Sequence, residues 1–178
     1  MCIRDRLRGE VNFPAFEQAL KGFSRYASGQ DRLLVLIDYT KPSTEKRFYI
    51  LDLLQKKLLL STYVAHGRGS GDNYAVAFSN RPGSYQSSLG FFRTGDTYMG
   101  KNGYSLFLDG LEKGINDKAR ERAIVVHGAN YADPAVLKGQ QRLGRSLGCP
   151  ALPPDISKQV IDTIKGGVLL YIYGLNKA

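Results

Sequence analysis

The sequence has no tryptophan, and it has only two cysteines, two histidines and two methionines among 178 residues. So few cysteines exclude a disulfide-rich scaffold, and so few histidines argue against a metal centre of repeated ligands. No apolar run approaches the length of a membrane span, and the longest near the start covers residues 33–37. Few side chains are therefore left that can carry chemistry.

Length and composition fit one domain with a sizeable core. A chain of 178 residues suits a single domain. Hydrophobic residues make up 43% of the chain and charged residues 23%, which is an ordinary composition for a soluble protein. The 11 tyrosines and 8 phenylalanines can build the core and also line a groove.

The charge is strongly positive, because 25 basic residues face 16 acidic ones and the net charge is +9. This balance favours an anionic partner such as nucleic acid, anionic lipid or an acidic wall polymer. The basic residues are scattered, however, and Lys56-Lys57 is the only lysine pair. With no recognition motif beside the charge, we expect no nucleic-acid partner.

The first eight residues differ in character from the rest of the chain. Residues 1–8 are basic and lack the apolar core of a signal peptide. We interpret this head as a non-native start and expect the true N-terminus, with any export signal, to be missing. Cys2 lies in this head, so we expect both Cys2 and Cys149 to be free thiols.

Periodicity predicts a helix at residues 13–26 and a β-rich body after it. Asn12 is the expected N-cap and Pro14 fits the first helical turn. Apolar residues at helical spacing form its buried stripe: Phe13, Phe16, Leu20 and Phe23. Strands are expected at residues 32–38, 47–53, 58–64, 104–108, 123–126 and 168–173.

Shorter signals complete the prediction of an α+β, β-rich fold. Glycines punctuate aromatic residues between residues 66 and 103, which predicts hairpins and loops over a sheet. Short helical segments are expected at 116–122 and 133–138, and a helix at 153–164 follows Cys149. We divide the chain into a tail and leading helix at 1–30 and one domain at 31–178.

Cys149 and His127 are the strongest candidates for chemistry. His127 directly follows the apolar run 123–126, so a rigid strand holds it near the surface. An imidazole beside a thiol favours the reactive thiolate. Arg145 offers a positive field or a contact to a carboxylate, and Gly148 allows close approach of a ligand to the backbone. The competing interpretation of Cys149 is an inert buried thiol.

Three other kinds of site fit the sequence poorly. The pattern Gly144-x-Ser146-x-Gly148 matches a hydrolase nucleophile elbow, but no histidine follows Ser146 to complete a triad. The spacing of His66, His127 and Cys149 matches no zinc motif, so we expect no metal. The glycine-rich stretch has no phosphate-loop sequence, and we expect no cofactor.

Several ordered motifs resemble the YkuD-type L,D-transpeptidases, in the branch of murein L,D-transpeptidase catalytic domains. The core of the resemblance is His127-Gly128, a loop, and then Ser146-x-Gly148-Cys149. The resemblance runs from about Leu33 to Tyr173. Its further motifs are His66-Gly67-Arg68, Asn73-Tyr74, Phe78-Ser79-Asn80, Pro82-Gly83-Ser84-Tyr85, Leu108-Asp109-Gly110-Leu111-Glu112 and Gly144-Arg145 with Pro150-Ala151.

The resemblance implies a fold, a reaction and roles for named residues. The fold would be that family's β-rich catalytic domain. Cys149 would attack the carbonyl at the diaminopimelate L-centre of a peptidoglycan tetrapeptide stem and expel D-Ala. A second stem's amine would then form a cross-link, or water would give L,D-carboxypeptidase action. His127 would be the base, oriented by the Gly128 carbonyl, and carbapenems would acylate the thiol.

One departure from the family pattern concerns Leu147, which stands where the family has a second histidine. His66 is the only candidate replacement, and a plain turn histidine is the competing interpretation. Pro150 has no N–H, so oxyanion donors must come from Cys149 and the residues before it.

Weaker candidates complete the predicted site. Ser146 is expected to form hydrogen bonds within the active-site loop, next to Leu147 and Gly148. Arg145 and His66 are expected to contact substrate. Asn73, Tyr74 and Tyr85 are candidates for the donor groove, although both tyrosines fit a core equally well.

The sequence leaves three functions open. They are the transpeptidase, a hydrolase using the same thioester, and a wall-binding module that lost turnover, which the Leu147 departure keeps open. We expect a monomer, exported to the periplasm or cell wall, with peptidoglycan stem peptides as partners.

Overall fold

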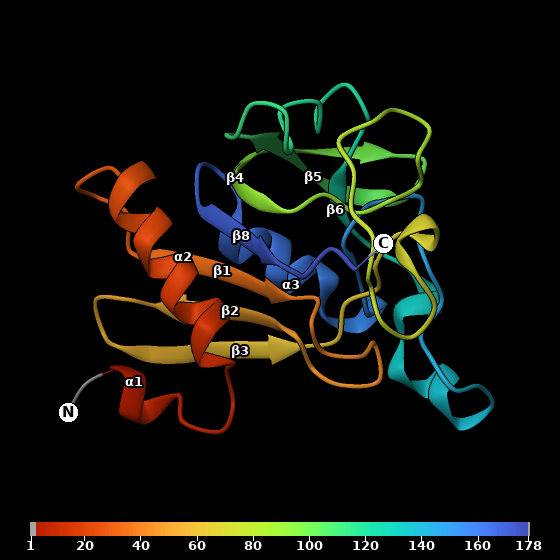
Figure 1. Ribbon diagram of the computed structural model, residues 1–178, viewed down its shortest axis with the longest axis horizontal. Helices are drawn as coiled ribbons and strands as arrows, with labels where there is room; N and C mark the ends of the chain where they lie inside the picture. Colours follow the sequence, from red (N-terminus) through yellow and green to blue (C-terminus); the bar gives the residue numbers. More distant parts are fainter. Residues whose placement is uncertain (1–2, 178) are drawn as a thin grey trace.

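The computed structural model describes residues 3–177 and shows a single curled sheet with helices on both sides (Figure 1). Its strands are β1 (Leu33–Asp38), β2 (Phe48–Asp52), β3 (Lys57–Thr62), β4 (Gly90–Gly100), β5 (Gly103–Gly110), β6 (Val125–Gly128), β7 (Ala151–Leu152) and β8 (Leu169–Tyr173). Its helices are α1 (Ile3–Arg6), α2 (Phe13–Tyr26) and α3 (Pro154–Ile164), with short 3₁₀ segments η1 (Arg68–Ser70), η2 (Asn130–Ala132) and η3 (Pro134–Lys138).

The eight strands form one sheet in the order β3-β2-β1-β8-β4-β5-β6-β7. Two neighbouring pairs, β1 with β8 and β6 with β7, are parallel, and the other pairs are antiparallel. Just after β3, Ala65 forms an antiparallel bridge to Ala151 in β7. This bridge brings the two edges of the sheet together, so the sheet is a nearly closed barrel with little exposed edge.

Alternation along β1 divides the core into an inner and an outer cluster. Val35 and Ile37 belong to the inner cluster, which also contains Cys149 and is packed by the buried face of α3. Leu34 and Leu36 point the other way, into the outer cluster under α2. Figure 1 shows α2 lying across this outer face of the sheet.

The predicted β-rich α+β fold is confirmed, and most elements lie within two residues of their expected places. The helix at 13–26 is α2, with Pro14 in its first turn. Asn12 is the N-cap residue of α2, as predicted, and its carbonyl accepts the Phe16 N–H. Its side chain makes no capping bond and instead donates to Thr40 Oγ1 at 3.4 Å.

Two further differences concern strands. The glycine-rich stretch ends in the long strand β4, which loop signals had hidden. Strand β6 begins at Val125 and contains His127, because Ala123 adopts a positive φ of 55° that interrupts the expected strand.

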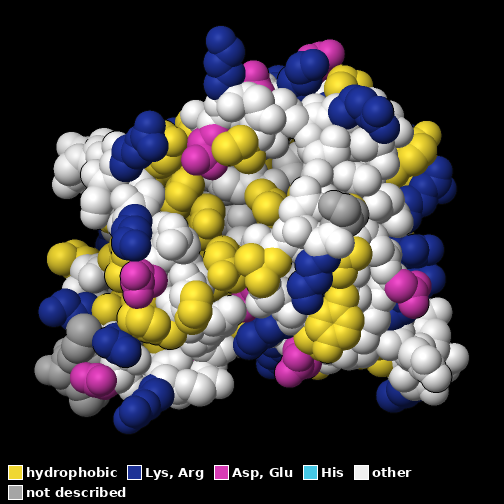
Figure 2. Space-filling view, in the orientation of Figure 1, with side chains coloured by type: hydrophobic (Ala, Val, Ile, Leu, Met, Phe, Trp, Pro, Cys, Tyr) yellow, Lys and Arg dark blue, Asp and Glu magenta, His cyan; other side chains and the backbone are white. Residues whose placement is uncertain are grey.

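Charged side chains are dispersed on the face shown in Figure 2, where Lys and Arg lie between hydrophobic patches and around the outline. On this face the basic side chains do not form a continuous stripe. Among residues 3–177, no helix has the length and apolar character needed to cross a membrane.

Candidate active site

Backbone pairing holds residues 146–149, called the Cys149 turn below, against the segment after β3. Ser146 bridges Gly67 in parallel orientation. The Ser146 N–H donates to the His66 carbonyl at 2.9 Å, and the Arg68 N–H donates to the Ser146 carbonyl at 2.8 Å. The chain at residues 66–68 therefore fixes the start of the Cys149 turn.

Within the turn, the Ser146 hydroxyl organises the backbone. It donates to the Cys149 carbonyl at 2.6 Å and accepts from the Gly148 N–H at 3.1 Å. Gly148 has a φ of +127°, and a Cβ there would lie 3.0 Å from the Gln86 carbonyl oxygen. Only glycine therefore fits this position without displacing a neighbour.

The thiol of Cys149 is buried between β6 and the chain that enters it. Sγ accepts the Val125 N–H at 3.4 Å and donates to the Ala123 carbonyl at 3.5 Å. Burial raises the pKa of Cys149 above its ordinary value. The Val125 N–H and the positive charge of Arg122 oppose this rise in the pKa.

The imidazole of His127 is held in one tautomer by its own strand. Its Nδ1 lies 2.9 Å from the Gly128 carbonyl, which can only accept, so Nδ1 carries the proton. Nε2 then presents its lone pair. Burial lowers the pKa of His127 more than the Gly128 bond raises it, so the ring is neutral at neutral pH.

A groove opens at His127. Its volume is about 510 Å³. Besides His127 and Gly128 it is lined by Lys101, Asn102, Tyr104, Ala129, Asn130, Tyr131, Pro154 and Ser157. The groove gives a peptide access to the imidazole.

The thiol and the imidazole come from neighbouring chain segments. His127 in β6 is paired with Ala151 in β7, two residues beyond Cys149. Among the described residues, however, no hydrogen bond joins Sγ to the ring, because the thiol points to Val125 and Ala123 instead. Catalytic contacts often tighten only when substrate binds, so this resting geometry is compatible with a working pair.

Two backbone N–H groups remain available beside the thiol. The Gly148 N–H is bonded to Ser146, and Pro150 has none. In the hydrogen bonds of residues 3–177, the N–H groups of Leu147 and Cys149 have no protein acceptor. These two are the candidates to stabilise an oxyanion.

His66 is fully engaged inside the protein. The buried Arg47 guanidinium donates to its Nδ1 at 2.8 Å, so Nε2 carries the proton and faces the Gly71 carbonyl at 3.4 Å. Burial and then the Arg47 charge lower the pKa of His66 to about 3. The ring therefore has no free lone pair for proton transfer. The contact of His66 with the Cys149 turn is made by its backbone carbonyl, which accepts the Ser146 N–H.

The remaining predicted residues differ in exposure and in their contacts. Leu147, Tyr74 and Tyr85 are exposed, so neither tyrosine is a core residue. Arg145 donates to the Gly71 carbonyl at 3.0 Å, close to the turn. Asn73 instead anchors Ser43 through two bonds of 3.1 and 2.9 Å, which is a structural role.

Tyr85 and Tyr74 occupy different places. The Tyr85 carbonyl lies so close to Gly67 that a Cβ on Gly67 would be 2.4 Å from it and 2.8 Å from the Gly148 Cα. Tyr85 therefore lies beside the Cys149 turn. Tyr74 lines a separate hollow with Thr40 and Leu175.

Arg122 is a residue that sequence reasoning missed. Its guanidinium donates to acceptors 34 to 43 residues earlier in the chain and lies beside the Cys149 turn. No local pattern in the sequence marks this arginine, because its partners are distant in sequence.

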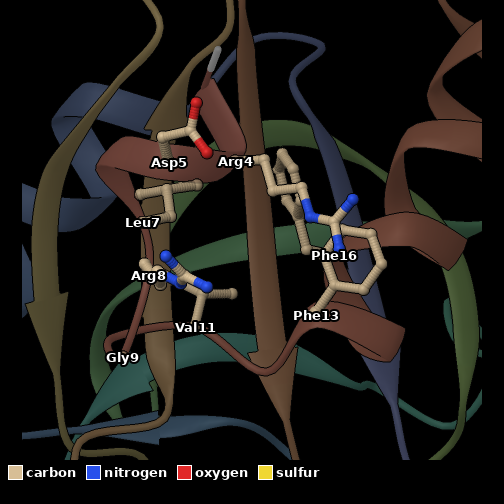
Figure 3. A pocket seen from close by; sticks show the side chains of 8 residues that line it. All are labelled: Arg4, Asp5, Leu7, Arg8, Gly9, Val11, Phe13 and Phe16. Atoms are coloured by element: carbon tan, nitrogen blue, oxygen red, sulfur yellow. The ribbon is translucent and has the colours of Figure 1, made fainter. Parts of the chain in front are cut away.

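A second pocket, of about 340 Å³, lies near the start of the chain (Figure 3). Side chains of α1, α2 and their connection line it, among them Arg4, Leu7 and Phe16. Leu7 and Phe16 belong to the outer core cluster, whereas Cys149 belongs to the inner one. This pocket therefore has no connection to the thiol.

Among residues 3–177, no cluster of three His, Cys, Asp or Glu side chains is placed to hold a metal ion.

Comparisons with known proteins identify a family and similar folds. Residues 7–173 match the family model of the L,D-transpeptidase catalytic domain. No curated protein matches the sequence significantly. Among solved structures, the helical cell shape determining protein Pgp2 from Campylobacter jejuni superposes with a TM-score of 0.53 at 18% identity, covering 83% of this chain and 50% of its own.

Two further structures are similar at lower TM-scores. An L,D-transpeptidase from Mycobacterium smegmatis gives 0.48 at 13% identity, with 80% of this chain and 59% of its own covered. The transpeptidase LdtMt1 in complex with imipenem gives 0.48 at 14% identity, with the same 80% and 59%. The present chain thus spans 50% to 59% of the length of these proteins.

Proposed function

Because the chain belongs to the L,D-transpeptidase catalytic domain family, we propose that it cross-links peptidoglycan stem peptides through a thioester on Cys149. The observation that carries this proposal is the pairing of β6 with the Cys149 segment. It places the segment that carries the buried thiol next to the strand that carries a neutral imidazole, whose Nδ1 is fixed on the Gly128 carbonyl. Acyl transfer requires a base that is oriented and within reach of the thiol.

The first half of the reaction forms the thioester. Burial raises the pKa of Cys149 and lowers that of His127, so the resting pair is a neutral thiol and a neutral imidazole. Rotation about the Cys149 Cα–Cβ bond turns Sγ from Ala123 toward His127 Nε2, which takes the thiol proton as Sγ attacks the stem carbonyl. The oxyanion accepts from the Cys149 and Leu147 N–H groups. His127 then returns the proton to the departing D-Ala amine.

The second half transfers the acyl group. The amine of a second stem attacks the thioester, His127 Nε2 accepts the amine proton, and the thiolate leaves. The proton on His127 then restores the Cys149 thiol, so the enzyme is unchanged and one amide has replaced another. If water attacks instead, the product is a shortened stem.

The groove at His127 is the proposed path for a stem peptide. Tyr104, Asn130 and Tyr131 line it and offer aromatic and amide contacts to a peptide. On the other side of the turn, Arg145 and Tyr85 are proposed to meet the donor stem, with Arg145 facing a carboxylate. The site of action is accordingly the periplasm or cell wall.

Product analysis tests the proposal and separates its alternatives. Purified protein is incubated with a disaccharide-tetrapeptide, and the products are identified by mass spectrometry, with Cys149→Ala as the control. We expect a dimer that has lost one D-Ala, absent in the variant. A tripeptide product alone identifies the L,D-carboxypeptidase. No product from folded protein contradicts both enzyme functions and favours a silent wall-binding module.

A further inference from the structure

The guanidinium of Arg122 ties a distant loop to the active-site turn. Its Nη1 donates to the Ser79 carbonyl at 2.8 Å and to Ser88 Oγ at 2.5 Å. Its Nη2 donates to the Gln86 carbonyl at 2.6 Å and to Ser84 Oγ at 3.2 Å. One side chain thus fixes four points of residues 79–88.

The same guanidinium adjoins the turn that carries Cys149. A Cβ built on Gly148 would lie 3.5 Å from Arg122 Nη2 and 3.0 Å from the Gln86 carbonyl that Arg122 binds. Ala123, the next residue, accepts the Cys149 thiol at 3.5 Å through its carbonyl. Its φ of +55° turns the chain there, so Arg122 and the thiol contact are set by one bend.

The charge of Arg122 has no carboxylate partner among the ion pairs of residues 3–177. All four of its acceptors are neutral carbonyl or hydroxyl groups. Its neighbour Arg120 differs, because it forms a two-point ion pair with Asp109. The positive charge of Arg122 is therefore uncompensated beside a thiol that can become negative.

Besides Arg122, the two phenols that interact with the thiol carry no positive charge at neutral pH. Burial raises the pKa of Tyr39 and of Tyr131 to about 12, so both are neutral phenols. Burial lowers the pKa of His127, so its imidazole is neutral. Arg122 is the cation whose charge favours the Cys149 thiolate.

We propose that Arg122 is a positioning residue that fixes residues 79–88 against the Cys149 turn and supplies the charge that stabilises the thiolate. The inference rests on the proposed function, since it treats Cys149 as the nucleophile. Buried in an apolar cluster, a thiolate would otherwise form only at high cost. A nearby cation reduces that cost in the step where Cys149 gives its proton to His127.

Variants at Arg122 separate its charge from its role as a structural tie. Arg122→Gln removes the charge and keeps hydrogen-bonding groups. Arg122→Lys keeps the charge and loses the planar fork that spans four acceptors. The matched control is Arg120→Gln, which removes an exposed arginine two residues away whose charge is already paired.

The experiment measures the rate of Cys149 alkylation by iodoacetamide from pH 6 to 11, located by peptide mass spectrometry. We expect Arg122→Gln to raise the thiol pKa by about one unit, which makes alkylation about tenfold slower below that pKa. Arg122→Lys should stay close to the wild-type pKa while its turnover falls, and Arg120→Gln should match wild type in both. A purely structural tie would slow turnover without moving the thiol pKa.

An unchanged thiol pKa in folded Arg122→Gln overturns the inference and leaves the proposed function standing. Circular dichroism establishes folding, and Arg122→Met serves as the neutral variant if Arg122→Gln does not fold. A wild-type thiol that never reacts, together with no product from stem peptide, contradicts the proposed function and this inference with it.

Discussion

At the scale of single residues, the state of the Cys149–His127 pair sets the pH dependence. The imidazole must be neutral to take the thiol proton, and burial lowers its pKa below the ordinary 6.5. We therefore expect the acidic limb of kcat/KM to lie below pH 6.5, because His127 stays neutral there. A pH–rate profile with stem peptide measures it. An acidic limb well above pH 6.5 would contradict the burial of a neutral base.

A second residue-scale prediction concerns His66, which is buried neutral with a pKa lowered to about 3. Unfolding restores a pKa near 6.5, so between these values the unfolded chain binds a proton that the native state does not. The contribution of His66 to the free energy of unfolding is fully present above pH 6.5. It falls as the pH drops toward 3, by at most about 1.4 kcal/mol per pH unit.

Guanidinium unfolding at several pH values measures this slope in wild type and in His66→Gln. The variant should show a shallower pH dependence and lower stability at neutral pH by about 1–3 kcal/mol, because the glutamine amide does not hold its acceptor where Arg47 meets Nδ1. Equal slopes in both proteins would show that His66 titrates normally. His127→Gln is the companion variant, since His127 is also buried and its pKa is also lowered.

Sequence reasoning at the residue scale found the residues whose chemistry is distinctive. Cys149 and His127 stood out because the chain has two residues of each type, and the strand before His127 is apolar. Nothing in the sequence around Arg122 distinguishes it from the other arginines. Its importance comes from contacts to residues 79–88, which only the folded chain brings close. His66 looked available for the same reason, because Arg47 reaches it from another strand.

At the scale of elements, the Cys149 turn depends on glycine at position 148. Its φ of +127° and the 3.0 Å approach to the Gln86 carbonyl both exclude a side chain. We expect Gly148→Ala to lower stability by about 1–3 kcal/mol and to abolish acylation, because the turn must shift. Thermal unfolding and acylation by a carbapenem measure the two effects.

The matched control for this variant is Gly139→Ala. Gly139 has a φ of −118° and its added Cβ would meet nothing within 4 Å. This control should retain wild-type acylation and stability within about 0.5 kcal/mol. If Gly148→Ala behaves like the control, the turn accommodates a side chain at position 148 and is not rigid.

Regular elements were predictable where one periodicity dominated. The apolar stripe of α2 and the apolar runs of β1, β2 and β8 gave their positions closely. Strand β4 was hidden because Gly90, Gly95 and Gly100 read as loop signals. Its pairing with β5 shifts register between Thr94 and Thr97, where Gly95 lies, so glycine here marks a bulge rather than a loop.

At the scale of the whole molecule, barrel closure places the site. The bridge between Ala65 and Ala151 joins the two edges of the sheet, and the Cys149 turn lies directly before it. Closure depends on pairing between segments about half a chain apart, which no local pattern predicts. The overall fold was nevertheless predictable, because ordered motifs along the chain resembled one family.

We expect the two core clusters to differ in role, because the outer one contributes stability and the inner one contains the proposed nucleophile. Helix α2 covers the outer cluster, and Cys149 lies in the inner one. Phe16 lies on the buried face of α2, so Phe16→Ala should cost about 3–5 kcal/mol of stability. Below its lowered unfolding temperature, the variant should keep the wild-type rate of acylation. A large loss of rate in the folded variant would show that the faces are coupled.

Cys149 is proposed to be an activated nucleophile in a pocket for stem peptides. Intact-protein mass spectrometry after addition of imipenem tests this role, with Cys149→Ala as control. We expect one stable adduct of the antibiotic's mass on the wild-type protein and none on the variant. Folded wild-type protein that gains no adduct, or a variant that gains the same one, would contradict it.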